Sequence, residues 1–160
     1  MEDYRVRDPI HGFIHFDEIE RKIIDSRPFQ RLRNIKQLAF CYYVYPGAMH
    51  TRFEHSLGVM ELATRVFDHF DNPKHPDHEQ FRASFGELDI KKAEEARRIL
   101  RLTALLHDIG HLPYSHSGES ILPEGRKHED VSVAVIQGSE IAEIIEKEIS
   151  RDIAEKIILF

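Results

Sequence analysis

Apolar residues recur at helical spacing along most of the 160 residues, and this period limits the fold more than any other feature of the chain. One apolar face follows Asp17, a residue type that favours a helix start, and is formed by Ile19, Ile23 and Ile24. Residues 54–70 repeat the pattern, and so do residues 89–109, where Asp89 is placed to cap the helix and Gly110 and Pro113 to stop it. The expected inward face of this last helix consists of Ala93, Ala96, Leu100 and Leu106. The chain is therefore predicted to belong to the all-α class.

The remaining segments complete this prediction. Residues 4–16 alternate around Asp8-Pro9 and Gly12, which predicts a short N-terminal β-hairpin. Pro28 suits the first turn of another helix, and further helices are expected from about Glu129 and Ser139. Residues 71–86 are polar and include Pro73, Pro76 and Gly86, which predicts an irregular surface loop or insertion; the surface insertion is expected over residues 71–90. Together these features predict one domain over residues 1–160, a helical bundle with a β-hairpin at its start.

Composition excludes several classes of function. The formal net charge is −6, which disfavours general DNA binding, because proteins that bind phosphate backbones non-specifically are usually basic. No apolar run approaches the roughly 18–20 residues that span a bilayer, so no membrane association is expected. The start of the chain does not resemble a signal peptide, and Cys41 is the only cysteine, which fits a reducing cytoplasm. We therefore expect a cytoplasmic protein.

Histidine is the unusual component, because 11 are present and many fall in three short polar segments: residues 50–56, 107–116 and 127–130. His107 and Asp108 directly follow an apolar helical stretch. A carboxylate there opposes the negative end of the helix dipole, and a bound cation would reverse that penalty. His55, at the start of its own helix, could supply a further ligand. A simple hydrogen bond between His107 and Asp108 is the alternative, but the neighbouring histidines favour a metal site.

The same segments resemble the HD superfamily of metal-dependent phosphohydrolases, and within it the deoxynucleotide triphosphohydrolase branch that includes the mammalian SAM-and-HD-domain enzyme. The resemblance covers nearly the whole chain apart from residues 71–90 and the tail after about residue 137. It is carried by five stretches: residues 8–12, 29–38, 42–48, 52–59 and 106–111.

The resemblance implies that His55, His107 and Asp108 are metal ligands. The family's fourth ligand is an Asp in a later helix, which we expect beyond Phe160, since the chain ends inside an apolar stretch and we expect the domain to continue. Imidazole and carboxylate ligands suit Fe, Mn, Ni or Zn, and Mg²⁺ could arrive with the substrate phosphates.

The implied reaction is hydrolysis of a deoxynucleoside triphosphate to the deoxynucleoside and inorganic triphosphate, with metal-activated water attacking the α-phosphorus. Arg52 matches the family's phosphate-contacting arginine, since a guanidinium fork suits phosphate oxygens. His111 and His128 match histidines near the α-phosphate. His116 is the expected general acid for the departing 5′ oxygen, with Glu119 tuning it where the family pattern has Asp.

Further matches concern substrate and effector. Gln37 and Leu38 match residues packed around the sugar, whereas Phe40 either reshapes the sugar or base pocket or is a core aromatic. Three residues match positions that hold an activating guanine nucleotide in the mammalian enzyme: Asp25, Gln30 and Arg33. The competing interpretation is that Arg31 and Arg33 form a solvated helix face. Relatives assemble, so we expect a homo-oligomer.

Two other functions stay open at this point. One is an HD phosphohydrolase that acts on another nucleotide, such as a monophosphate or a cyclic nucleotide. The other is a non-catalytic nucleotide-binding or assembly fragment. Bound metal and the products formed from dGTP distinguish all three.

Overall fold

The computed structural model describes residues 4–85, 90–148 and 157, and it is mostly helical. Two antiparallel strands, β1 (Tyr4–Asp8) and β2 (Gly12–Phe16), precede the helices. The α-helices are α1 (Glu18–Asp25), α2 (Arg27–Gln30), α3 (Arg52–Phe70), α4 (His78–Ala83), α5 (Ile90–Leu106), α6 (His128–Gly138) and α7 (Glu140–Glu148). Three 3₁₀ helices lie between them: η1 (Arg31–Asn34), η2 (Cys41–Tyr43) and η3 (Ser115–Ile121). The prediction of a helical bundle with a short N-terminal hairpin is confirmed.

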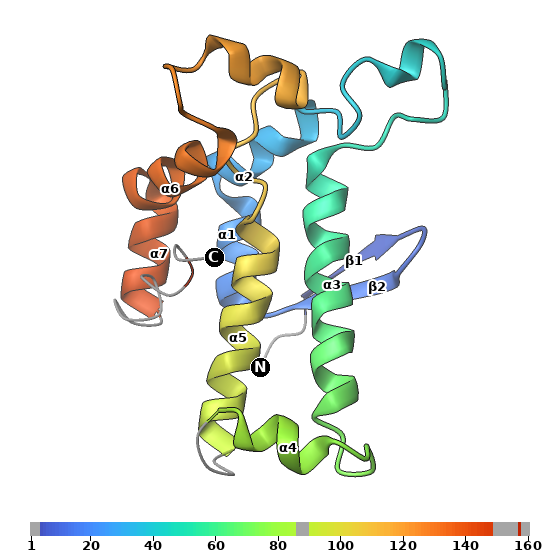
Figure 1. Cartoon of the computed structure of the whole chain (residues 1–160), viewed down its shortest axis with the longest axis vertical. Helices are drawn as coiled ribbons and strands as arrows, with labels where there is room; N and C mark the ends of the chain where they lie inside the picture. Colours follow the sequence, from blue (N-terminus) through green and yellow to red (C-terminus); the bar gives the residue numbers. More distant parts are fainter. Residues whose placement is uncertain (1–3, 86–89, 149–156, 158–160) are drawn as a thin grey trace.

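The centre of the fold is the pair of long helices α3 and α5, which run side by side (Figure 1). α1 and α2 lie behind α5, α6 and α7 lie on its outer side, and the hairpin lies against α3 (Figure 1). The shared core is almost entirely aliphatic and aromatic and includes Ile14, Ile23, Phe29, Met60, Leu105 and Ile145. Burial of this apolar surface is the main favourable term that holds the helices together.

One buried arginine joins the hairpin to the helical core. Arg101 on α5 donates to the Glu20 carboxylate on α1 at 2.6 and 2.8 Å, to the Thr64 hydroxyl at 2.5 Å and to the His15 carbonyl at 2.8 Å. Each of these acceptors lies on a different element. A buried guanidinium is tolerated because its donors are satisfied in this way, so Arg101 ties β2, α1, α3 and α5 together.

Local sequence signals account for two of the helix starts. The Asp17 side chain accepts hydrogen bonds from the backbone N–H groups of Ile19 and Glu20, and the Glu20 carboxylate accepts one from the Asp17 N–H, which is the capping box expected of an N-cap Asp. α3 begins two residues earlier than the apolar period predicts. There the Glu54 carboxylate accepts from both the backbone N–H and the hydroxyl of Thr51.

Three predictions about local structure are wrong. The insertion 71–90 is not wholly irregular, because α4 forms within it and Phe81 packs edge-on against Phe67 at 5.1 Å between ring centroids. Leu100 does not face inward, since its side chain is 37% exposed while Leu102 and Leu105 of the same helix are buried against the core. α5 ends at Leu106 rather than near residue 109. The expected cap Asp89 lies outside the described residues.

Among the described residues, no helix combines the length and the apolar character needed to cross a bilayer.

Candidate metal centre

Two chain segments that are far apart in sequence meet at one end of the α3–α5 pair. Arg52 and His55 stand on the first turn of α3, three residues apart, so their side chains point to the same side of the helix. The capping box of Thr51 and Glu54 holds that turn in place. His107 and Asp108 lie in the turn that directly follows α5. The turn frees both side chains from the roughly 100° separation that a helix would impose on neighbours.

Three candidate ligand atoms converge there. The Nε2 atoms of His55 and His107 are 3.2 Å apart, and each lies 3.4 Å from the same Asp108 carboxylate oxygen, Oδ2. Ligand atoms bound about 2.0–2.2 Å from one ion at tetrahedral or octahedral angles are about 2.8–3.6 Å apart. The donor set and its spacing therefore fit a divalent transition metal. The structure brings together the three residues predicted as ligands, and metal binding by them stays a prediction.

Hydrogen bonding also orients one ligand. Nδ1 of His107 lies 2.7 Å from the Ala104 carbonyl oxygen, which can only accept, so Nδ1 carries the ring proton. In the neutral ring the lone pair is then on Nε2, the atom that faces His55 and Asp108. Metal-binding histidines are commonly held through the other ring nitrogen in this way.

Electrostatics keep the carboxylate ionised. Burial alone would raise the pKa of the Asp108 carboxyl, but hydrogen bonds from His107 and His111 and the charge of Arg52 hold that pKa far below its usual range. Burial lowers the pKa values of His55 and His111, so both favour the neutral ring. For His107 the effect of burial is outweighed by Asp108, which raises its pKa. An ionised Asp108 beside the neutral ring of His55 suits a cation, and a metal that binds His107 would displace a proton from its ring.

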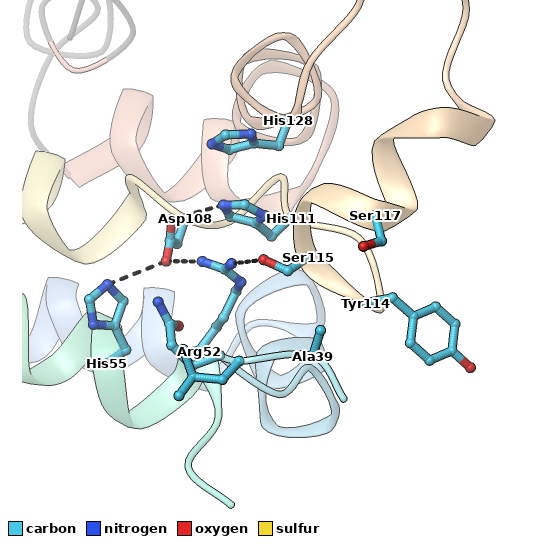
Figure 2. A pocket seen from close by; sticks show the side chains of 11 residues that line it. Ala39, Arg52, His55, Asp108, His111, Tyr114, Ser115, Ser117 and His128 are labelled. Carbon is cyan, nitrogen blue, oxygen red and sulfur yellow. Dashed lines mark hydrogen bonds and ion pairs between the residues drawn. The ribbon is translucent and has the colours of Figure 1, made fainter. Parts of the chain in front are cut away.

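Arg52 is buried beside this cluster. Its Nη1 donates to Asp108 Oδ2 at 2.5 Å and its Nη2 to the Ser115 hydroxyl oxygen at 2.5 Å (Figure 2). Its Nε has no acceptor among the described residues. Ser115 and the preceding Tyr114 both adopt positive φ angles, 57° and 71°, an unfavourable conformation for residues with a Cβ. Sequence reasoning missed Ser115, because nothing in its neighbourhood marks it as a partner of a residue 63 positions away.

The predicted catalytic histidines form a second group next to Asp108. His111 Nε2 lies 3.3 Å from Asp108 Oδ1, and the His111 ring stacks on His128 with centroids 3.8 Å apart (Figure 2). His128 Nδ1 lies 2.7 Å from the Glu119 carboxylate. The structure therefore gives Glu119 a partner in His128 that the sequence did not predict. The side chain of His116 lies outside what the structure describes, so its pairing with Glu119 stays a prediction.

One cavity of about 570 Å³ is lined by Arg52, His55, Asp108, His111, Ser115 and His128, whereas His107 and Glu119 are not part of its lining. Its lining also includes both residues predicted to contact the sugar, Gln37 and Leu38. Gln37 Oε1 is buried and accepts no hydrogen bond from any residue in the described part of the chain. Phe40 is not a core residue, since its ring is half exposed and stacks on Tyr114 at 4.6 Å.

Two of the three residues predicted to bind an effector contact each other directly. Arg33 donates to Gln30 at 2.8 Å and lies 3.5 Å above the Phe53 ring. Asp25 instead pairs with Arg21 at 3.2 Å. Arg31 does not belong to a solvated helix face, because its guanidinium donates to the backbone of the His107–His111 turn.

Gly110 allows α6 to approach this turn. A Cβ on Gly110 would lie 2.2 Å from both the His128 carbonyl oxygen and the Ser132 backbone nitrogen. The Gly110 N–H donates to the Ser132 hydroxyl at 2.9 Å across the same contact. This close approach brings His128 onto His111.

Gly110→Ala is therefore expected to lower the free energy of unfolding by about 2 kcal/mol or more, since backbone atoms must move apart to admit the methyl group. Urea denaturation measures the change. Gly138→Ala is the matched control, because no atom of the described residues lies within 4 Å of the added Cβ. Equal stability of the two variants would contradict the packing described here.

The fold and site define a helical protein with a candidate centre for a divalent metal. The family model of the HD domain matches residues 52–159, and the chain belongs to the HD domain family, the metal-dependent phosphohydrolases.

Relatives and a solved structure are similar to this chain over most of its length. The chain is 37% identical to a putative HD domain-containing protein of Acanthamoeba polyphaga mimivirus over 94% of this chain and 33% of that protein. It is 45% identical to the deoxynucleoside triphosphate triphosphohydrolase SAMHD1 of Bos taurus over 69% of this chain and 17% of that protein. A crystal structure of a hypothetical protein from Aquifex aeolicus superimposes with a TM-score of 0.77 at 36% identity, covering 98% of this chain and 37% of that one. The chain thus spans between 17% and 37% of the length of these proteins.

Proposed function

We propose that the protein uses a divalent metal, held by His55, His107 and Asp108, to hydrolyse deoxynucleoside triphosphates to the deoxynucleoside and inorganic triphosphate. One observation carries the proposal. A single cavity is lined by two of the candidate ligands, a buried guanidinium and a stacked histidine pair. The similarity to proteins described as deoxynucleoside triphosphate triphosphohydrolases in Bos taurus and Mus musculus supports the choice of substrate.

The phosphate end of the cavity has the charge that the reaction requires. A bound divalent metal supplies Lewis acidity that activates water near neutral pH. Arg52 donates from its two Nη atoms to Asp108 and Ser115, and its Nε has no acceptor among the described residues. Its guanidinium therefore places positive charge where phosphate oxygens would lie. His111 and His128 face the same space and can donate to the α-phosphate (Figure 2). The water oxygen joins the α-phosphorus and releases a proton to solvent, the bond from phosphorus to the 5′ oxygen breaks, and His116 protonates that oxygen.

The sugar end of the cavity is formed by Gln37 and Leu38. A buried amide oxygen without a donor is costly, so Gln37 Oε1 gains from a hydroxyl that donates to it. A sugar hydroxyl is a donor of the right kind. Leu38, nearly half exposed in the cavity wall, offers an apolar surface to the deoxyribose face.

Effector binding and assembly belong to the proposal as well. The Gln30–Arg33 pair and Asp25 are the proposed contacts for an activating guanine nucleotide. A homo-oligomer is supported by exposed apolar side chains close together in sequence, namely Tyr43, Val44 and Tyr45. Light scattering of the full natural protein should report more than one subunit, and a monomer at all concentrations would contradict this.

The products of dGTP hydrolysis test the proposed reaction. The full natural protein, supplied with Mn²⁺ in water enriched in ¹⁸O, should yield deoxyguanosine and tripolyphosphate in the phosphorus NMR spectrum, with the label in tripolyphosphate. A sample treated with EDTA is the control and should be inactive. Orthophosphate or pyrophosphate would contradict attack at the α-phosphorus, and binding of dGTP without turnover would favour a non-catalytic nucleotide-binding protein.

A further inference from the structure

Arg31 holds the turn that carries the candidate metal ligands, although it lies about 80 residues away in sequence. Its Nη1 donates to the His111 carbonyl at 2.8 Å and its Nη2 to the Ile109 carbonyl at 2.5 Å. The side chain comes from η1 and is partly buried. One guanidinium therefore joins two backbone carbonyls on either side of Gly110.

These hydrogen bonds satisfy acceptors that the turn itself leaves open. Within the turn, the Ile109 N–H donates to the Leu106 carbonyl and the His111 N–H to the Asp108 carbonyl. Arg31 donates to two further carbonyls of the turn, those of Ile109 and His111. Buried backbone carbonyls need such partners, so a particular path of the turn is favoured when Arg31 is in place.

The clamped carbonyls belong to His111 itself and to Ile109, the residue directly after Asp108. His111 Nε2 reaches Asp108 Oδ1 at 3.3 Å, while Asp108 Oδ2 faces the two ligand histidines at 3.4 Å. A shift of the backbone at residues 109–111 would therefore move the carboxylate relative to His55 and would separate His111 from it.

We propose that Arg31 is a positioning residue of the metal centre: by clamping the Ile109 and His111 carbonyls it holds the Asp108 carboxylate and the His111 ring in register with His55 and His107. The inference rests on the proposed metal binding by these residues, and it is independent of which nucleotide is hydrolysed.

Two substitutions separate the geometry of the clamp from its charge. Arg31→Lys keeps the positive charge, but an ammonium on a flexible stem does not reproduce the planar fork. Arg31→Gln removes the charge. Arg97→Lys is the matched control, because Arg97 also makes a bidentate contact, to Asp68, on an exposed part of α3 and α5.

Co²⁺ binding to the full natural protein is the measurement, by competition with a chelator and by the visible absorption of the bound ion. Groups that orient metal ligands typically contribute about 10–100-fold to metal affinity. We expect both Arg31 variants to lose affinity in that range and to show an altered Co²⁺ spectrum, with Arg97→Lys unchanged. Wild-type affinity and spectrum in a folded Arg31→Lys variant would overturn the proposal. Failure of both Arg31 variants to fold would also overturn it, because Arg31 would then serve the fold as a whole.

The outcome is separate from that of the proposed function. If the wild-type protein releases a product other than triphosphate while Co²⁺ binding depends on Arg31, the substrate proposal fails and the positioning role stands. If triphosphate is released and Co²⁺ binding does not depend on Arg31, the substrate proposal stands and the positioning role fails.

Discussion

Replacing His107 and Asp108 together with Ala is expected to reduce bound transition metal from about one ion per chain to background. The reason is geometric, since the two residues supply two of the three atoms that lie 3.2–3.4 Å apart, and His55 alone cannot hold an ion. Elemental analysis of the purified protein measures the loss. Retention of full metal content in this variant would refute the assignment of the centre.

A control is needed because Asp108 also pairs with Arg52 inside the protein. Removing one member of a buried ion pair typically lowers the free energy of unfolding by about 3–5 kcal/mol, so the double variant will be destabilised as well. His55→Ala avoids this, because its side chain is a third exposed and does not contact Arg52 through any hydrogen bond between described residues. It should also lose metal. His69→Ala, an exposed substitution on the same helix, should retain it.

His116→Ala is expected to slow dNTP hydrolysis by about 10²–10⁴-fold while leaving metal content unchanged. The expected loss is that of one well-placed proton donor, since His116 is the proposed acid for the departing 5′ oxygen and is not among the three proposed ligands. Single-turnover rates with dGTP measure the effect.

The control for this variant is His75→Ala, which removes an imidazole from the segment between α3 and α4, at the other end of α3 from the metal centre (Figure 1). Its turnover should match that of the unaltered protein. If His116→Ala kept full activity, the general acid would have to be reassigned, and His128, paired with Glu119, is the next candidate.

The parts of the fold that the sequence predicts are those governed by local rules. The hairpin follows from its turn residues, and α1 from Asp17 and an apolar face. α4 could not be predicted in this way, because the aromatic contacts of Phe81 with Phe67 and Phe85 stabilise it within a polar segment. The exposure of Leu100 likewise depends on how α5 is rotated against α3, which no local pattern specifies.

The same distinction holds for the candidate centre. His55, His107 and Asp108 were predicted as ligands, on the position of the His-Asp pair after a helix and on the family resemblance, and the structure brings them together. Arg31 and Ser115 were not identified, because their partners lie about 60 to 80 residues away in sequence. Arg31 donates to backbone carbonyls, and Ser115 accepts from Arg52 through its hydroxyl. Contacts of that kind leave no periodic signal in the chain.

The metal centre can be located by anomalous diffraction from crystals of the full natural protein grown with Mn²⁺. An anomalous peak is expected within about 2.0–2.2 Å of His55 Nε2, His107 Nε2 and a carboxylate oxygen of Asp108. A protein that binds Mn²⁺ in solution but shows its anomalous peak away from these three atoms would contradict the account.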